Sequence, residues 1–358
     1  MRVCYFGQYD PDYARNQIIR HGLTLAGVEV VPCLVKMELG FPHRYLALSR
    51  KFSKIPKPFD AVIVAEVNQP IVFLAKMLTQ LYRLPLIFDP FISRYDTLVI
   101  DRGIVPQNST EARYLYWTDR LSMNLADHVF ADTYQHRLYY QEKFKVHRSI
   151  SVVPIGANTR IFYPQPTEAK KNSTDPLEIL FWGTFIPLQG IQFILKAAHI
   201  LQENRQPVCF RMAGNGQTFA EMQNIASELN LNNVTFLNYI AAKQLPSFIQ
   251  TADIVLGIFG DTQKTLRVVP NKLYEGLAMA KPVITGDTPA LRELFTPGQH
   301  LHAVPVANPE SLAEAIIQLI ENKEYRYHLA QQGYKYFSEQ FSAEKIGHTI
   351  RDILEELI

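Results

Sequence analysis

The sequence has few cysteines: Cys4, Cys33 and Cys209 are the only ones among its 358 residues. Their wide spacing fits neither a disulfide framework nor a zinc-finger pattern, so we expect reduced thiols and a cytoplasmic location. Long apolar runs are also missing, because a run such as residues 254–259 is far shorter than the ~18 residues of a membrane span. The apolar run within residues 1–7 is too short and too soon interrupted to be the hydrophobic region of a signal peptide. These absences predict a protein that is soluble or peripheral to a membrane.

Glycine and proline together make up only 39 of the 358 residues, while hydrophobic residues make up 47% of the chain. That composition excludes collagen-like, low-complexity and disordered chains, and it is ample for large cores. At about 150 residues per domain, a chain of this length predicts two domains.

No charge dominates overall, since the formal net charge is only +2, but the two halves differ. Residues 1–166 carry 20 Lys and Arg against 14 Asp and Glu. The excess gathers in a segment that also contains apolar residues, and its cations are Arg44, Arg50, Lys51, Lys54 and Lys57. Such a segment rests on an anionic membrane surface or is an ordinary solvated surface, and both interpretations stay open. No nucleic acid partner is expected, because the pI of 8.3 is mild and no nucleic-acid-binding motif is present.

Strand-like and helix-like segments alternate along both halves of the chain. In the first half we expect strands at residues 2–6, 28–35, 61–67, 86–88, 126–131 and 151–155, and helices at 13–26, 71–82, 111–125 and 134–144. In the second half we expect strands at 178–182, 208–213, 234–237, 252–259 and 282–285, and helices at 191–202, 219–229, 271–280, 309–321 and 343–357. This alternation predicts an α/β fold with two doubly wound, Rossmann-like domains facing across a cleft. The expected domains are residues 1–163 and 178–340, joined by a linker over residues 164–177.

Two strand-to-helix turns in the second half carry glycines. Gly183 directly follows one strand and precedes Thr184, and the next such turn contains Gly214, Asn215 and Gly216. Turns without a Cβ let backbone N–H groups approach phosphate oxygens, and the following helix N-terminus adds positive charge. Glycines also end strands for purely structural reasons, so a phosphate site and a plain turn both remain open.

Three cations precede or begin the helix expected from Asn271. Lys264, Arg267 and Lys272 approach a helix N-terminus, where positive charge is unfavourable unless an anion is shared. The alternative is three solvated side chains on a loop. One turn further on, the Glu275 carboxylate suits hydrogen bonding to a ribose diol, or is a surface or capping glutamate.

Ordered segments of the chain, at residues 126–133, 152–164, 183–190, 212–216 and 271–284, resemble the motifs of a known family. The chain is similar to the retaining glycosyltransferases of family 4, among the glycosyl transferases group 1, which have the GT-B fold. The resemblance covers nearly the whole chain. It implies transfer of a sugar from a UDP- or GDP-sugar to an acceptor hydroxyl with retention, in glycoconjugate synthesis and without a cofactor.

The resemblance also assigns donor contacts. Glu275 matches the second glutamate of the family's E-x(7)-E pair, and Leu273 lies in the same motif. Asn238 and Tyr239 match a segment that contacts the nucleotide base. The last helix, within residues 341–358, is expected to cross back to the first domain.

Three positions depart from the family pattern. Thr184 and Gln189 stand where members usually have Arg and Lys, and Arg267 stands where the first glutamate is expected. Our hypothesis is that Lys264, Arg267 and Lys272 replace the missing cations. They would stabilise the leaving nucleoside diphosphate without a metal, with Arg267 as a catalytic residue.

The first half offers fewer acceptor candidates. Gly7 and Asp10 lie in the loop where members of the family bring glycines close to the donor phosphates and the acceptor. Asp10 and Asp12 also imitate a D-x-D site, but a metal needs more oxygen ligands than this loop offers, so none is expected. Asp89 is a candidate acceptor-binding base, or only forms a turn before Pro90.

Two rival functions remain. One is a non-catalytic nucleotide-sugar-binding scaffold on the same fold, and the other is a nucleotide-sugar epimerase. The acceptor, whether lipid, glycan or small molecule, carries no motif in the sequence.

Overall fold

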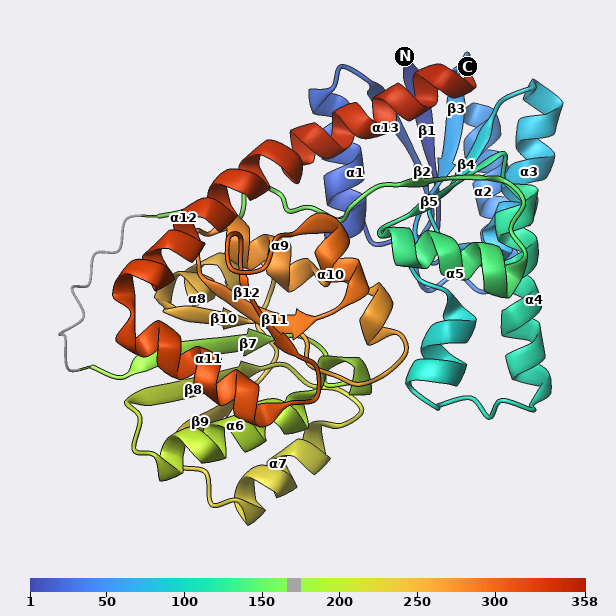
Figure 1. Cartoon of the computed structure of the whole chain (residues 1–358). Helices are drawn as coiled ribbons and strands as arrows, with labels where there is room; N and C mark the ends of the chain where they lie inside the picture. Colours follow the sequence, from blue (N-terminus) through green and yellow to red (C-terminus); the bar gives the residue numbers. More distant parts are fainter. Residues whose placement is uncertain (166–174) are drawn as a thin grey trace. The chain divides into compact units, whose positions relative to one another are not determined.

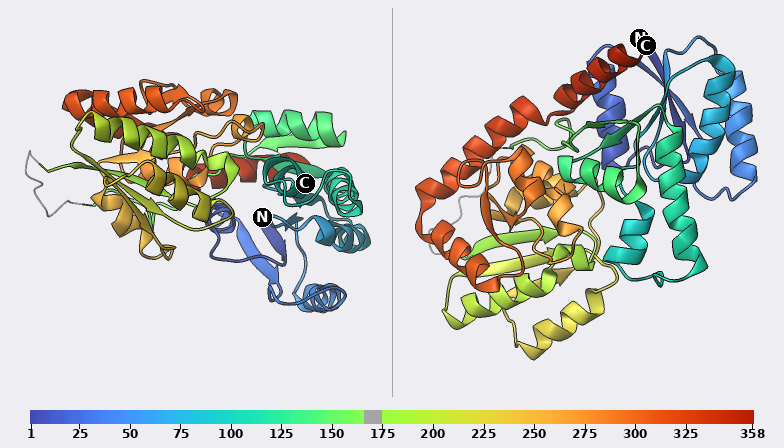
Figure 2. Two further views of the ribbon diagram at one scale, coloured as in Figure 1. Left: turned by 90° about the horizontal axis from the view of Figure 1, so that it is seen from below. Right: turned by 45° about the vertical axis from the view of Figure 1, so that its right-hand side comes forward.

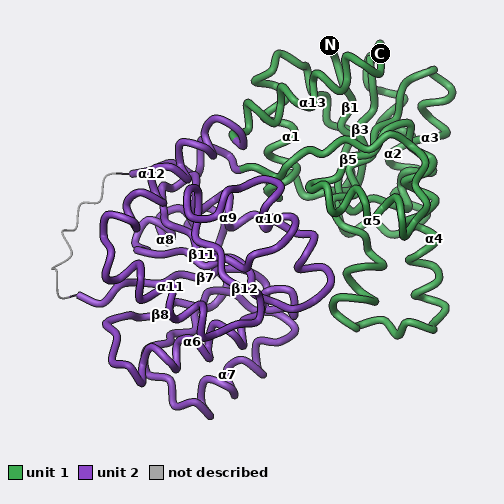
Figure 3. Tube along the Cα trace, viewed as in Figure 1, with its two compact units in different colours: residues 1–156, 342–358 green, residues 157–341 purple. Residues whose placement is uncertain are grey.

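The computed structural model describes residues 1–165 and 175–358, so most of the expected linker, residues 164–177, lies outside the described residues. The chain divides into two compact units. Unit 1 comprises residues 1–156 and 342–358, and unit 2 comprises residues 157–341 (Figure 3). Each has its own sheet and core.

Unit 1 is built on a six-stranded parallel sheet of order β2-β1-β3-β4-β5-β6. Its strands are β1 (Arg2–Gly7), β2 (Glu29–Leu34), β3 (Ala61–Val64), β4 (Leu86–Phe88), β5 (His128–Ala131) and β6 (Ser149–Val152). The chain starts at β1, one strand in from the edge of the sheet, adds β2 at that edge, and then adds β3 to β6 in order on the other side of β1. The turn in direction at β1 places several loops at the carboxyl ends of the strands, where such sheets bind ligands.

Helices cover both faces of this sheet (Figures 1 and 2). They are α1 (Ala14–Leu25), α2 (His43–Lys54), α3 (Gln69–Tyr82), α4 (Thr110–Leu125), α5 (Tyr134–Phe144) and α13 (Ala343–Leu357), with a π-helical segment, η1 (Asp96–Asp101). Alternate strand residues such as Phe6 and Val64 pack into a core with side chains of α2, α3 and α5. Tyr5, the residue before Phe6 in β1, points to the opposite face of the sheet, where its hydroxyl donates a hydrogen bond to Asn16 Oδ1 of α1.

Helix α13 packs against α1 at a pair of glycines. A Cβ on Gly347 would overlap the backbone of Gly22, and a Cβ on Gly22 would overlap the carbonyl oxygen of Ala343. Two helical backbones approach this closely only where side chains are absent. The last helix of the chain is therefore an integral part of unit 1.

Unit 2 repeats the plan with a sheet of order β12-β11-β10-β7-β8-β9. Its strands are β7 (Leu177–Trp182), β8 (Val208–Ala213), β9 (Val234–Leu237), β10 (Ile254–Leu256), β11 (Val283–Asp287) and β12 (His302–Pro305). Its helices are α6 (Ile191–Glu203), α7 (Phe219–Glu228), α8 (Leu245–Thr251), α9 (Asn271–Ala278), α10 (Pro289–Leu294), α11 (Pro309–Glu321) and α12 (Lys323–Gln340), with 3₁₀ turns η2 (Pro187–Gln189) and η3 (Thr265–Arg267).

The predicted α/β class is confirmed, since both sheets are parallel and doubly wound. The sequence did not predict α2, α8, α10, α12 or β12. Helix α12 was missed because its apolar periodicity is weak. Helix α2 has an apolar face, but most of its residues are polar or charged, so its segment was interpreted as a basic surface. In the described parts of the chain, no helix has the length and apolar character to cross a bilayer, and the three cysteines are free thiols.

Candidate functional site

A cavity of about 230 Å³ opens at the carboxyl ends of β7, β8 and β9 in unit 2. Its lining residues are Trp182, Gly183, Thr184, Ala213, Gly214, Asn215, Tyr239, Ile240, Ala242 and Leu245. Five of the predicted donor-binding residues are brought together here: Gly183, Thr184, Gly214, Asn215 and Tyr239. The carboxyl edge of a parallel sheet is the expected place for a ligand in such a fold.

The two glycine turns are packed directly on each other. Gly183 and Gly214 have φ angles of +144° and +140°, and a Cβ on Gly214 would overlap the carbonyl oxygen of Gly183. The Phe185 N–H donates to the Asn215 carbonyl at 2.9 Å, which ties the turns together. Glycine is thus required by the fold at these positions, and the same lack of side chains leaves the backbone open toward the cavity.

Lys272, from the first turn of α9, reaches under the Gly183 turn. Its ammonium donates to Gln189 Oε1 at 2.5 Å and lies 3.6 Å from the centre of the Phe181 ring. A Cβ on Gly183 would be 3.3 Å from Lys272 Nζ. The side chain is buried, and burial lowers the pKa of Lys272 well below its ordinary value, opposed by the nearby Glu275. A buried lysine side chain from α9 therefore lies against the turn whose own sequence lacks a basic residue.

Glu275 lies one turn further along α9 and is held by the cavity-lining Trp182. The indole Nε1–H donates to Glu275 Oε2 at 2.9 Å. Burial raises the pKa of Glu275 to about 7, while Trp182 and Lys272 oppose the rise. The carboxyl is thus fixed in position and titrates near neutrality. Trp182 and Gln189 were not predicted as donor-site residues; the signal that marks Trp182 is its position immediately before Gly183.

The remaining donor candidates lie differently. Gly216 supports the first turn, because a Cβ there would be 2.6 Å from the Phe185 carbonyl oxygen. Asn238 is exposed beside the cavity without lining it. The prediction for Leu273 is corrected: its side chain is fully buried in the core and its N–H donates to Pro270 O, so neither is left for a ligand.

Lys264 immediately precedes the short η3 turn before α9, and Arg267 is the last residue of that turn. Lys264 is buried and Arg267 is half-buried. Neither belongs to the cavity lining, and their roles as phosphate ligands, including the catalytic role of Arg267, remain predictions.

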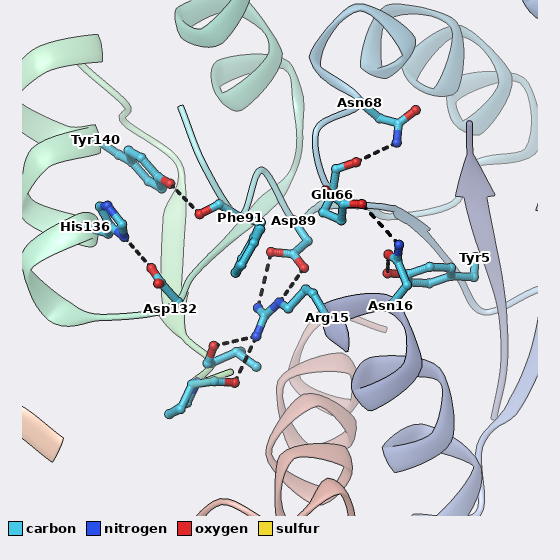
Figure 4. Close-up of polar contacts among 12 residues, drawn as sticks. Tyr5, Arg15, Asn16, Glu66, Asn68, Asp89, Phe91, Asp132, His136 and Tyr140 are labelled. Atoms are coloured by element: carbon cyan, nitrogen blue, oxygen red, sulfur yellow. Dashed lines mark hydrogen bonds and ion pairs between the residues drawn. The ribbon is translucent and has the colours of Figure 1, made fainter. Parts of the chain in front are cut away.

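In unit 1, the carboxyl edge of the sheet carries a second polar cluster (Figure 4). At its centre, the Arg15 guanidinium donates to both oxygens of Asp89 at 2.8 and 3.2 Å. It also donates to the carbonyls of Val153 and Pro154. Both members of the ion pair are fully buried.

This geometry corrects the role predicted for Asp89. Its carboxylate has no solvent-exposed surface, and both oxygens are committed to a cation. A general base needs a side chain that reaches the substrate proton. Asp89 instead anchors Arg15, which in turn holds the chain that leaves β6.

A carboxylate that the sequence did not single out lies next to this pair. Glu66 Oε1 accepts from Asn16 Nδ2 at 3.2 Å, and burial raises the pKa of Glu66 to about 7. Asn68 clamps the surrounding backbone by donating to the carbonyls of Glu66 and Gln8 and accepting from the Gln8 N–H. Val67, between the two, has φ +55°, which is rare for a β-branched residue and marks strain of the kind that gathers at functional sites.

The other acceptor candidates surround this loop. Gly7 is buried with φ +149°, and a Cβ there would press on Asn68. Asp10 is exposed, and its Oδ1 accepts from the Asp12 N–H at 2.9 Å, so Asp10 and Asp12 form a turn. Throughout residues 1–165 and 175–358, no group of three or more His, Cys, Asp or Glu side chains is arranged to hold a metal ion.

Comparison with known proteins defines the class. Residues 165–336, nearly all of them in unit 2, match the family model "Glycosyl transferases group 1". An uncharacterized glycosyltransferase of Methanocaldococcus jannaschii is 26% identical over 262 residues, which are 71% of this chain and 66% of that protein. Alpha-D-kanosaminyltransferase of Streptomyces kanamyceticus is 21% identical over 50% of this chain and 45% of that protein. The chain thus aligns with less than two thirds of the length of these relatives.

Solved structures extend the likeness to the whole chain. Sucrose-phosphate synthase of Thermosynechococcus elongatus has a TM-score of 0.74 at 15% identity, covering 100% of this chain and 99% of that one. Anabaena HepE in complex with UDP has a TM-score of 0.71 at 15% identity, covering 99% and 100%. The predicted GT-B fold and the resemblance to group 1 glycosyltransferases are confirmed.

Proposed function

We propose that this protein transfers a sugar from a nucleoside diphosphate sugar to an acceptor hydroxyl. The proposal rests on one observation: unit 2 combines an open cavity, two glycine turns, the buried Lys272 and the Glu275 carboxyl held by Trp182. Relatives bear glycosyltransferase names, and a structure of the same fold was solved with UDP. The donor is proposed to be a UDP- or GDP-sugar, and the resemblance to family 4 supports the proposal that the transfer retains the anomeric configuration.

The cavity suits the nucleoside part of the donor. Tyr239 leaves 76% of its surface exposed at a rim that also includes Ile240 and Leu245, so a flat base can stack or pack there. Glu275 is proposed to accept from the ribose hydroxyls. Its position is fixed by Trp182, so little side-chain entropy is lost on binding.

The diphosphate is proposed to lie over the Gly183 turn and Lys272. A departing nucleoside diphosphate develops negative charge, and a preorganised cation with backbone N–H groups stabilises that charge without reorganisation. The buried ammonium is desolvated in the free protein, so an anion placed beside it regains the favourable interaction that burial removed. Arg267 and Lys264 are proposed as further phosphate ligands.

For the acceptor we propose the loops of unit 1 around Gly7 and Glu66. Glu66 replaces Asp89 as the candidate that binds the acceptor hydroxyl. It accepts a hydrogen bond from Asn16, and Arg15 acts on it as a nearby charge, but among the described residues it forms no ion pair like the one that holds Asp89 to Arg15. The wider role is proposed to be glycoconjugate synthesis.

The test is turnover by the purified chain. UDP-, GDP- and ADP-sugars, each with a panel of lipid, glycan and small-molecule acceptors, should yield free nucleoside diphosphate and a glycosylated product. Nucleotide-dependent stabilisation without release in any combination would favour the non-catalytic scaffold, which the substitution of Arg267 for the family glutamate makes a specific rival. A changed sugar still attached to its nucleotide would indicate the epimerase.

A further inference from the structure

Helices α2, α3 and α4 of unit 1 form an apolar groove on their outer side. A cavity of about 290 Å³ is lined there by Tyr45, Pro70, Phe73, Tyr114, Trp117, Thr118 and Leu121. The spacing of Pro70, Phe73 and then Met77 and Leu81 follows one face of α3, and Tyr114, Trp117 and Leu121 follow one face of α4. Figure 1 shows α3 and α4 neighbouring each other in unit 1.

The side chains along this groove are unusually exposed for their type. Met77 and Leu81 leave 70% and 74% of their surface exposed, and Trp117 leaves 49%. Tyr114, Leu121 and, on α2, Leu46 are also exposed. Contiguous exposed apolar surface with polar groups around it marks an interaction site rather than ordinary solvated surface.

The charged side chains of the three helices that form the groove are mostly positive, although Lys76 is paired with Asp127 at 2.5 Å. The cations of the three helices are Arg44, Arg50, Lys51, Lys54, Lys76, Arg113 and Arg120. Their acidic residues are Glu111 and Asp119, and Asp119 is buried, where it accepts from Ser93 and from the Tyr95 N–H. Arg120 lies 5.1 Å from the Trp117 ring centre, so one cation touches the apolar rim itself.

We propose that this face docks on a bilayer of anionic phospholipid, with the apolar side chains of α3 and α4 entering the interface and the surrounding cations meeting lipid phosphates. Apolar burial and attraction to anionic headgroups act together in such binding, and each Lys or Arg near the surface adds about 1 kcal/mol. A second copy of the chain fits poorly, because a two-fold interface on this face would bring the same cations against each other. From the sequence, the basic segment could be interpreted either as a membrane-binding surface or as an ordinary solvated surface. The apolar groove on the same helices favours the membrane-binding interpretation.

The proposal deepens the proposed function, because it places the enzyme where lipid-linked acceptors are found, but its test needs no turnover. The full chain is mixed with vesicles of phosphatidylcholine alone or with 30% phosphatidylglycerol, and the bound fraction is measured by flotation. We expect binding to the anionic vesicles at low salt, and a loss of more than ten-fold at high salt or without phosphatidylglycerol. Binding of UDP to the same preparation, measured without vesicles, reports separately on the donor site.

Two variants separate the two contributions. Met77→Ser with Leu81→Ser removes apolar contacts, and Arg50→Glu with Lys54→Glu reverses charge; each is expected to weaken vesicle binding more than ten-fold. The matched controls lie on α12 of unit 2, where Tyr327→Ser changes a side chain that is 67% exposed and Lys335→Glu reverses an exposed cation; both should bind as the wild type does. Equal binding to uncharged vesicles, no binding to anionic ones, or a dimer that the Met77/Leu81 variant abolishes would each overturn the proposal.

Discussion

At the scale of single residues, Lys272 and Glu275 share one buried environment, which lowers the pKa of Lys272 and raises the pKa of Glu275 to about 7. Diphosphate binding favours the protonated lysine, so its affinity should fall as pH rises through the lowered pKa of Lys272. Ribose binding favours the ionised glutamate, so affinity should also fall as pH drops below about 7. A plot of UDP affinity against pH is therefore expected to have a maximum, measurable by calorimetry.

The two limbs of that curve can be assigned separately. Lys272→Met should remove the alkaline limb and weaken UDP roughly 10- to 100-fold, the range for a charge-assisted hydrogen bond, while uridine is little affected. Glu275→Gln should remove the fall in affinity at acidic pH, both for UDP and for uridine. If Lys272→Met binds UDP as well as the wild type does, the diphosphate lies elsewhere.

A second prediction at this scale concerns Asp89 and Arg15. Removing one partner of a fully buried ion pair leaves an uncompensated charge, so Asp89→Asn should lower the free energy of unfolding by about 3–5 kcal/mol. Replacing both, as in Arg15→Met with Asp89→Leu, should recover most of that stability. Urea denaturation measures both effects. A stable Asp89→Asn protein that has lost only activity would restore the catalytic role that the sequence suggested.

At the scale of helices and strands, the sequence predicts what apolar periodicity controls. The ranges expected for β4, β8 and α11 coincide with those observed, because each carries a regular buried pattern. The range expected for α5 also coincides, although the apolar periodicity of that helix is weak. The strand expected over residues 252–259 ends at Leu256, since Phe259 leaves the sheet to donate to the Gln189 carbonyl. That contact joins residues 70 positions apart, and no local pattern encodes it.

The same limit explains what could be predicted of the site. Glycine turns and the α9 motif are local, so Gly183, Gly214 and Glu275 could be placed from the sequence. The partner of Asp89 lies 74 residues away, and the bond from Trp182 to Glu275 spans 93 residues. Only the folded chain brings such distant residues together. Their hydrogen bonds and ion pairs determine which carboxyl group is held by a protein partner and which can bind a ligand.

The contact of α13 with α1 gives a prediction at the scale of an element. Gly347→Ala places a Cβ against the Gly22 backbone, and overpacking of this kind typically costs 1–3 kcal/mol. Thermal unfolding should show a lower midpoint for this variant. Gly40→Ala is the control, because a Cβ there meets no atom within 4 Å. An unchanged midpoint for Gly347→Ala would mean that α13 does not pack as described.

At the scale of the whole molecule, the chain crosses between its units twice, near residues 156 and 341, so unit 1 is completed only by the end of the chain. The cavity, Lys272 and Glu275 all belong to unit 2. Ligand binding to one compact unit stabilises the backbone of that unit first. The donor and the acceptor are thus proposed to be held by separately folded cores.

Hydrogen exchange on the full chain tests this division. Saturating UDP is expected to slow exchange in residues 183–190, 213–218 and 271–279 of unit 2, because their backbone N–H groups form or border the proposed site. Exchange in unit 1, including α1 and α13, should change far less, and uridine should protect the α9 segment without the full effect at the Gly183 turn. Protection concentrated at the Gly7 and Glu66 loops would instead place the nucleotide on unit 1. Equal protection of all segments would indicate that the units do not respond separately, because a ligand that orders only one core cannot slow local opening in the other.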